Sequence, residues 1–283
     1  MSVRIIIDST TDVSPAYQNR VRVVPLTIRF GDTELIDGVT VSRQRFYEML
    51  VESDELPTTS QASPAAFERE YASAAQAGDS AVVLTISAQL SGTHQSACIA
   101  AQDFENVVVV DSQSATIGAG ILAQYAVDCA ERGMSAAEIA ARLEEKRDDV
   151  CVIALLDTLE YLKRGGRISK TAAIAGGLLN LKPVASIENG RVTVIGKARG
   201  SRQGNNLLMQ KIRDCGGVDF DLPVLLGYTG LSDALLRKYM EDSRAVWEGH
   251  ADTLPQVQVG SVIGTHGGPG AVVAAFFRTG SRA

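Results

Sequence analysis

The first half of the chain alternates short Val- and Ile-rich runs with segments that carry helix-start signals, and this alternation restricts the fold most. The apolar runs lie at 3–7, 21–30, 81–86, 107–111 and 150–156. Helices are predicted after Ser42, at Ser63-Pro64 and at the capping box Ser135–Glu138. Such alternation is typical of a parallel sheet covered by helices on both faces. We therefore predict an α/β fold with an N-terminal domain built on a mainly parallel sheet flanked by helices.

The second half of the chain has a different pattern. Residues 159–181 look helical, but Gly165-Gly166 and Gly176-Gly177 interrupt them. Two apolar runs, 184–187 and 192–195, flank Asn189-Gly190, which is the strongest short signal for a β-hairpin.

Further helix–strand alternation follows the hairpin. We predict a helix near 205–215, a strand at 223–228, a helix at 233–247 and a strand at 257–263. This pattern indicates a mixed α+β domain at the C-terminus. We place the domains at 1–157 and 158–283.

Composition argues against several classes of protein. The chain has 33 acidic and 27 Lys or Arg residues, and this net charge of −6 argues against a nucleic-acid partner. No apolar run approaches the ~20 residues that span a bilayer. The first residues lead directly into a strand pattern, so we expect neither a transmembrane segment nor a signal peptide. The scattered cysteines lack a Cys-x-x-Cys pair, which favours reduced thiols and a cytoplasmic protein.

Hydroxyl side chains gather where the predicted strands end, which is where parallel sheets bind ligands. Asp8-Ser9-Thr10, Ser87 to Thr93 and Asp111-Ser112 each follow a predicted strand, whereas Thr58-Thr59-Ser60-Gln61 lies just before a capped helix. Hydroxyls near helix N-termini, with free backbone N–H groups, can bind an anion. The same residue types also serve as ordinary caps and turns, and the pattern leaves that alternative open.

Ser91-Gly92-Thr93 is the most specific of these segments, because it follows a predicted strand and precedes a helical pattern. Gly92 would allow the backbone to approach a ligand closely. The segment lacks the spacing and lysine of a phosphate-binding loop, and it is not a Gly-x-Ser-x-Gly nucleophile turn. No Gly-x-Gly-x-x-Gly follows the first strand, so a dinucleotide fold is not predicted.

Two other segments carry candidate site residues. His266 lies in the glycine-rich stretch 264–270, for which we predict tight turns with exposed amides. A histidine in a turn is often structural, but the glycine setting favours a functional one. Lys163-Arg164-Gly165-Gly166-Arg167 concentrates positive charge, as a solvated surface or as a carboxylate site. Neither histidines nor cysteines show metal-ligand spacing, so we expect no metal.

Taken in order, these motifs resemble the DegV family of bacterial fatty-acid-binding proteins over nearly the whole chain. The blocks that carry the resemblance are 5–10, Asp37-Gly38-Val39, Thr59-Ser60-Gln61, Leu90-Ser91-Gly92-Thr93, Asp111-Ser112, 159–168, 178–183, Arg199, 264–266 and 268–270.

The resemblance implies a two-domain α/β carrier without a cofactor, holding one long-chain fatty acid between its domains. It implies that Thr59 and Ser91, with Gly92 beside them, bind the fatty-acid carboxylate. It places His266, Arg167 and Arg199 near that head group or near a partner. The implied partner is a fatty-acid kinase of the dihydroxyacetone-kinase-like type, whose acyl phosphate product enters phospholipid synthesis.

The chain departs from the family pattern at three positions, and two other functions stay open. Ala62 replaces a frequent proline, His94 a frequent aromatic residue and Gly267 a frequent threonine. These departures leave acyl-chain preference and partner identity undecided. The alternative to a carrier is a serine hydrolase or acyltransferase with Ser91 as nucleophile and His266 as base. A third alternative, a transcriptional or signalling regulator, is disfavoured by the acidic charge and the lack of a basic helix-turn-helix.

Overall fold

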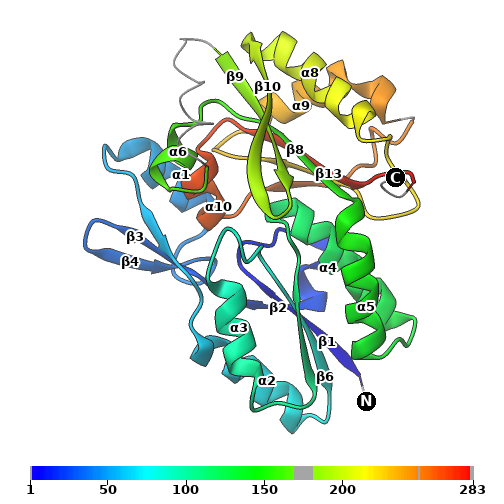
Figure 1. Ribbon diagram of the computed structural model, residues 1–283. Coiled ribbons are helices and arrows are strands. Elements are labelled where there is room, and N and C mark those ends of the chain that lie inside the picture. Colours follow the sequence, from blue (N-terminus) through cyan, green and yellow to red (C-terminus); the bar gives the residue numbers. More distant parts are fainter. Residues whose placement is uncertain (1, 169–180, 248, 281–283) are drawn as a thin grey trace.

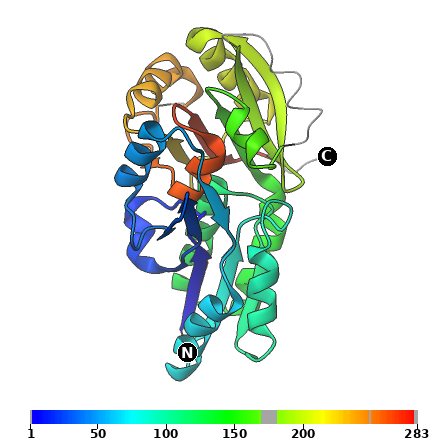
Figure 2. The same cartoon turned by 90° about the vertical axis from the view of Figure 1, so that its left-hand side faces the viewer.

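The computed structural model describes residues 2–168, 181–247 and 249–280 (Figure 1). A parallel sheet and a larger mixed sheet form the two ends of an elongated molecule (Figure 2). The parallel sheet has the strand order β2-β1-β6-β7. Its strands are β1 (Val3–Asp8), β2 (Val21–Val24), β6 (Ser80–Thr85) and β7 (Val107–Asp111).

Helices cover both faces of this parallel sheet, as the sequence predicts. Ile5 and Ile7 of β1 point to the face that carries α4 (Thr116–Glu131) and α5 (Ala136–Lys146). Ile6 points to the opposite face, among buried side chains of α2 (Pro64–Gln76) and α3 (Thr93–Ala101). Because successive side chains of a strand point to opposite faces, an unbroken apolar run such as β1 fills both cores.

The predicted helix starts are confirmed by their hydrogen bonds. The Ser42 side chain accepts a hydrogen bond from the backbone of Arg45 at the start of α1 (Arg43–Glu52). Ser63 caps α2 in the same way, with Pro64 in its first turn. Ser135 and Glu138 form the complete capping box of α5. These caps satisfy N–H groups that the first helical turn leaves without partners.

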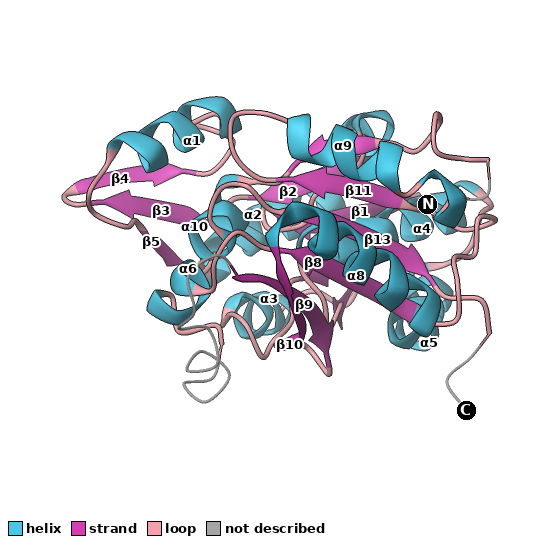
Figure 3. Ribbon diagram, turned by 90° about the horizontal axis from the view of Figure 1, so that it is seen from above, coloured by secondary structure: helices cyan, strands magenta, loops and turns pink. Residues whose placement is uncertain are grey.

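The second large sheet has the strand order β10-β9-β8-β13-β11-β12, and all neighbours are antiparallel except β11 and β12. Asn189 and Gly190 adopt positive φ angles of 50° and 74° at the predicted hairpin turn between β9 and β10. The helices α8 (Gly200–Asp214) and α9 (Ala234–Asp242) lie over this sheet (Figure 3). The strands are β8 (Val150–Leu155), β9 (Leu181–Glu188), β10 (Arg191–Arg199), β11 (Leu225–Tyr228), β12 (Gln256–Gln258) and β13 (Val272–Phe277).

The run 150–156, which the sequence predicts to belong to the parallel sheet, lies instead in the six-stranded sheet. As β8 it pairs antiparallel with β9 and β13. An apolar run shows that a strand is buried but does not identify its sheet. The division into domains 1–157 and 158–283 stays a prediction.

The run 21–30 also differs from the expected single strand. Pro25 lacks a backbone N–H and separates β2 from β3 (Thr27–Phe30). The second strand belongs to a small antiparallel sheet with β4 (Thr33–Ile36) and β5 (Thr58–Ser60). This small sheet brings β5 beside α10 (Ser261–Gly267).

The predicted strand at 257–263 and the predicted turns at 264–270 are also wrong in part. Only Gln256–Gln258 is a strand, and α10 (Ser261–Gly267) follows it. The helix predicted at 233–247 ends at Asp242 and continues as a 3-10 turn, η3 (Arg244–Val246). Within 159–181 the structure describes α6 (Glu160–Arg164), whereas residues 169–180, with Gly176-Gly177, lie outside the described residues.

The helix α4 packs between the two large sheets. Its buried Ile117 and Ile121 belong to one core with β1 residues on one side and Val273 of β13 on the other. No helix within the described ranges is long and apolar enough to cross a membrane. The shared core around α4 holds the carboxyl ends of β1 and β6 opposite one face of the six-stranded sheet. We call this the inner face; it is the face turned away from α8.

Candidate functional site

A cavity lies between the carboxyl ends of the parallel strands and the inner face of the six-stranded sheet. The space between its atoms, with the open solvent at its mouth included, measures about 970 Å³. Aliphatic side chains make most of its wall. These are Leu26, Ile86, Leu90, Ala115, Val152, Ala154, Leu156, Leu162, Ala185, Ile187, Val192, Val259, Val262, Ile263, Ala271 and Val273.

The alternation of side chains in β8 explains why this wall is apolar. Val152 and Ala154 face the cavity, whereas Ile153 and Leu155 belong to the core beneath α8. A strand that is covered on both faces must be apolar on both, which is why the sequence of β8 is an unbroken hydrophobic run.

Four of the predicted site residues line this one cavity. They are Thr59 of β5, Ser91 in the loop before α3, Arg167 after α6 and His266 of α10. All four are partly buried. The cavity therefore combines an aliphatic wall with hydroxyl, imidazole and guanidinium groups from elements far apart in the sequence.

Thr59 and His266 form a direct contact. The Thr59 hydroxyl oxygen lies 2.9 Å from His266 Nε2. Burial, with the nearby charge of Arg167, lowers the pKa of His266 from its ordinary 6.5 to about 4. The imidazole is therefore neutral at neutral pH. Its Nδ1 is buried and has no hydrogen-bond partner among the described residues.

Gly165 allows α6 to pack against this imidazole. A Cβ atom at Gly165 would lie 2.1 Å from His266 Nδ1, which is far inside van der Waals contact. The sequence suggested only a helix interruption at Gly165-Gly166. A contact between residues so far apart in the chain leaves no local signal.

Ser91 and Gly92 lie at the N-terminus of α3, where the sequence places them. The Ser91 hydroxyl is 2.9 Å from the Thr93 hydroxyl and accepts a hydrogen bond from the Thr93 backbone N–H at 3.2 Å. A Cβ at Gly92 would lie 2.1 Å from Gln61 Oε1. Gly92 thus makes room for Gln61, which in turn donates to Ser96 at 2.8 Å. This contact holds β5 and the Ser91 loop at one end of the cavity.

The two predicted arginines lie in different surroundings. Arg167 donates to the backbone carbonyls of Leu90 at 3.2 Å and Gly165 at 2.6 Å. It therefore connects the Ser91 loop to α6 at the cavity. Arg199 is exposed at the end of β10, precedes α8 and does not line the cavity.

Two buried carboxylates that are not among the predicted site residues lie at the N-terminus of α10, although Asp37 belongs to one of the blocks that carry the family resemblance. Asp12 accepts a hydrogen bond from the Gly260 N–H at 3.0 Å and pairs with Arg43 at 2.8 Å. Asp37 lies close to Ser261, in the first turn of the same helix. Burial raises the pKa of both carboxyl groups, and the charge of Arg43 opposes this shift. These bonds position the helix that carries His266.

A family model described as "Uncharacterised protein, DegV family" matches residues 2–279 of this chain. The chain belongs to the DegV family. A DegV domain-containing protein of Deinococcus radiodurans is 35% identical over 280 residues, covering 96% of this chain and 97% of that protein.

Solved DegV structures have the same fold. One is a fatty-acid-binding DegV family protein from Thermus thermophilus, with 33% identity and a TM-score of 0.85 over 98% of this chain and 100% of that one. Another is a DegV lipid-binding protein from Thermotoga maritima, with 28% identity and a TM-score of 0.86 over 99% and 100%. No group of His, Cys, Asp or Glu in the described part of the chain could hold a metal ion.

Proposed function

We propose that this chain binds one long-chain fatty acid in the cavity and presents its carboxylate to a partner kinase. The partner would be of the dihydroxyacetone-kinase-like type, and the acyl phosphate would enter phospholipid synthesis. The observation that carries the proposal is one aliphatic cavity that also contains Thr59, Ser91, His266 and Arg167. The DegV proteins from Thermus thermophilus and Thermotoga maritima, described as fatty-acid-binding and lipid-binding, support it.

Burial of the acyl tail would supply most of the binding free energy. A C16 tail has about 14 methylenes at ~0.8 kcal/mol each, or on the order of 11 kcal/mol before the cost of association. The head-group contacts then need only to orient the ligand. Thr59 and Ser91, with Gly92 at the same loop, would do this at the polar end.

The neutral groups at that end suit a carboxylate that must still react. With its proton on Nε2, His266 donates to the Thr59 oxygen, and the Thr59 hydroxyl proton is then available to the carboxylate. Hydroxyl donors stabilise the anion without a tight ion pair, so its oxygen keeps its nucleophilicity toward a phosphoryl donor. Arg167 adds positive charge nearby, and Arg199, which is exposed and does not line the cavity, would contact the partner rather than the ligand.

The hydrogen bonds favour a carrier over the hydrolase or acyltransferase with Ser91 as nucleophile and His266 as base. A nucleophilic serine needs its base within hydrogen-bond distance. Ser91 is bonded to Thr93, and Nε2 of His266 is bonded to Thr59. The two side chains are therefore engaged with other partners.

The direct test is to purify the protein, denature it and identify the released lipid by mass spectrometry. We expect one long-chain fatty acid per chain. Release of no lipid, or only of phospholipid, would contradict the proposal. Ester hydrolysis that is lost in Ser91→Ala would support the enzyme instead.

The same variant separates the two roles of the site. Ser91→Ala should reduce kinase-dependent phosphorylation of the bound acid at least tenfold while most of the acyl chain is retained, because the tail contacts remain. Ser53→Ala, at the C-terminal end of α1 and outside the cavity, is the matched control. Equal loss of retention and phosphorylation would count against this division of roles.

A further inference from the structure

Two cysteines lie against each other on the outer side of the six-stranded sheet. Cys151 is the second residue of β8, and Cys215 is the C-cap residue of α8. Both residues are only partly buried and pack against the same hydrophobic core. Cys151 pairs with Phe276 of β13, and the hydroxyl of Thr279, three residues further on, donates to the carbonyl of Gly216, next to Cys215. The two thiols are close enough to influence each other's titration. Cys151 shares with Ile153 the face of β8 that packs beneath α8. The thiol pair is thus separated from the cavity by the sheet itself.

The surroundings distinguish Cys215 from the two cysteines outside this pair. The contact with Cys151 and the charge of Arg278 lower the pKa of Cys215 against the effect of burial. Burial instead raises the pKa of Cys98 and of Cys129. Because the thiolate is the reactive form, Cys215 is the cysteine favoured for oxidation.

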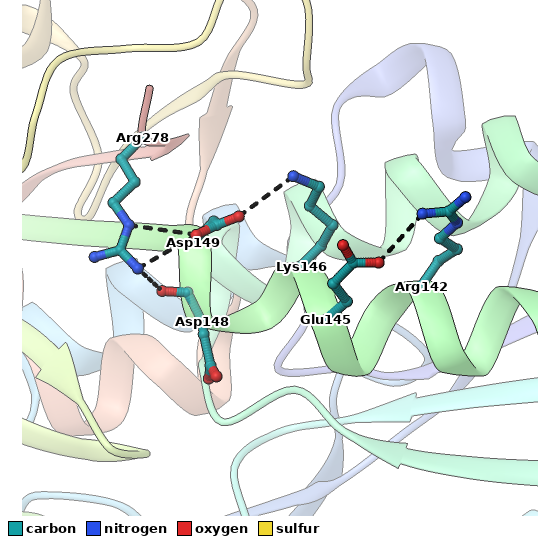
Figure 4. A network of polar contacts seen from close by, with 6 residues as sticks. All are labelled: Arg142, Glu145, Lys146, Asp148, Asp149 and Arg278. Carbon is teal, nitrogen blue, oxygen red and sulfur yellow. Dashed lines mark hydrogen bonds and ion pairs between the residues drawn. The ribbon is translucent and has the colours of Figure 1, made fainter. Parts of the chain in front are cut away.

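Arg278 is held in position by the turn that precedes β8. Its guanidinium lies 3.3 Å from an Asp149 carboxylate oxygen and donates to the Asp148 carbonyl at 2.8 Å (Figure 4). Lys146 also contacts Asp149, at 3.3 Å. The positive charge near Cys215 is therefore fixed by the fold.

We propose that Cys151 and Cys215 form a redox-active dithiol that a peroxide oxidises to an intramolecular disulfide. The Cys215 thiolate attacks one oxygen of hydrogen peroxide, the O–O bond breaks, and a sulfenic acid and hydroxide form. Cys151 then attacks that sulfur, the S–O bond breaks, and the disulfide forms as water leaves. Both sulfurs are oxidised and the peroxide is reduced. A dithiol reductant reverses the reaction.

The disulfide would have a measurable effect on stability. It would close a ring from β8 to the end of α8 that includes the β9–β10 hairpin. Closing so long a loop restricts the denatured chain, which stabilises the folded one. We therefore expect the oxidised protein to melt several degrees above the reduced protein.

The test uses the full-length protein. Reduced protein is treated with hydrogen peroxide, remaining thiols are blocked with N-ethylmaleimide, and the digested peptides are analysed by mass spectrometry. We expect a crosslink between the peptides of Cys151 and Cys215, removed by dithiothreitol together with the gain in melting temperature. Cys215→Ser should abolish the crosslink, and the matched control Cys98→Ser should keep it.

Three outcomes would overturn the inference. Cys151 and Cys215 could both stay reduced, and therefore be alkylated, while Cys98 or Cys129 is oxidised. The crosslink could form only between molecules, with a yield that rises with protein concentration. Cys215 could proceed to sulfinic acid without any crosslink. Peptide mapping of the oxidised wild-type protein by mass spectrometry decides among these outcomes even if Cys215→Ser does not fold.

Discussion

Among single residues, His266 has the most consequential environment, because its charge state decides what the polar end of the cavity can bind. Its pKa in the folded protein is about 4, against an ordinary value of 6.5. The folded protein therefore resists protonating this imidazole, whereas the unfolded chain accepts the proton readily. Neutral His266 can share a hydrogen bond with Thr59, and protonation would replace that arrangement with a buried cation close to Arg167.

This difference predicts a pH-dependent loss of stability that belongs to His266. The unfolded chain binds the proton first, so the wild-type protein should lose stability relative to His266→Gln as the pH falls from 6.5 toward 4. The full difference would be roughly 3 kcal/mol. Above pH 6.5 the relative stability of the two proteins should not change with pH.

Urea unfolding of both proteins at pH 7.5, 6, 5 and 4 measures this change. Buried carboxyl groups such as Asp12 and Asp37 also titrate, but they are present in both proteins and cancel in the comparison. A stability difference that stays constant from pH 7.5 to pH 4 would show that His266 titrates normally.

At the scale of elements, the site depends on the close approach of α6 and α10. Gly165 at the end of α6 lies directly against His266, and a Cβ there would overlap with the imidazole. Gly267 lies on α10 itself and has no positive φ, and a Cβ there would have no described atom of a neighbouring residue within 4 Å. The two glycines therefore offer a matched pair of substitutions in one neighbourhood.

Gly165→Ala should separate the two helices or rotate His266 away from Thr59. We expect a loss of stability of about 1–3 kcal/mol from overpacking and at least a tenfold loss of fatty-acid affinity. Gly267→Ala is the control for stability and should leave the melting temperature unchanged, because the added methyl group meets no neighbouring atom; since Gly267 lines the cavity, its effect on affinity should be well below tenfold. Thermal melting and displacement of a fluorescent fatty acid measure both. Equal effects of the two substitutions would contradict this account of the helix contact.

Local signals in the sequence predicted individual elements well. The capping residues Ser42, Ser63 and Ser135 and the turn Asn189-Gly190 each act through neighbours in the chain, so a single sequence reveals them. The predictions that failed concern features that depend on contacts between segments far apart in the chain. The assignment of β8 to the second sheet depends on its pairing with β9 and β13, which no local pattern encodes.

The prediction of site residues likewise succeeded where the signal was local and failed where it depended on distant contacts. Hydroxyls after a predicted strand pointed to Ser91, and hydroxyls before a predicted helix pointed to Thr59. The glycine-rich stretch pointed to His266, although that residue lies in a helix rather than a turn. Arg199 came from the family resemblance alone and does not line the cavity. The apolar run 257–263 suggested a strand because a short run of that kind fits a strand and a buried helix equally well.

At the scale of the whole molecule, the cavity exists because two sheets meet end to face rather than face to face. Face-to-face sheets would interdigitate their side chains and leave no space. Here the carboxyl ends of β1 and β6 approach the inner face of β8, β9 and β13, with α4 as a shared support. Small side chains on that face, such as Ala154 and Ala185, keep the space open.

The size of those side chains should therefore set the length of acyl chain that fits. Ala154→Leu adds the bulk of about three methylenes to the cavity wall, while the outer face of β8 is unchanged. We expect the variant to fold and to retain shorter fatty acids than the wild-type protein, with a shift of roughly that many carbons. The comparison is made by mass spectrometry of lipid released from proteins purified side by side.

Ala154→Gly is the matched control, because it removes a methyl group at the same position and should leave the chain-length distribution unchanged or move it toward longer acids. Ala154 lies on a central strand, and a leucine side chain that turned outward would disturb the core beneath α8. Such a change would lower the melting temperature, which is therefore measured for the same variant. A folded Ala154→Leu protein that retains the same acids as the wild type would mean that the acyl tail does not run along β8.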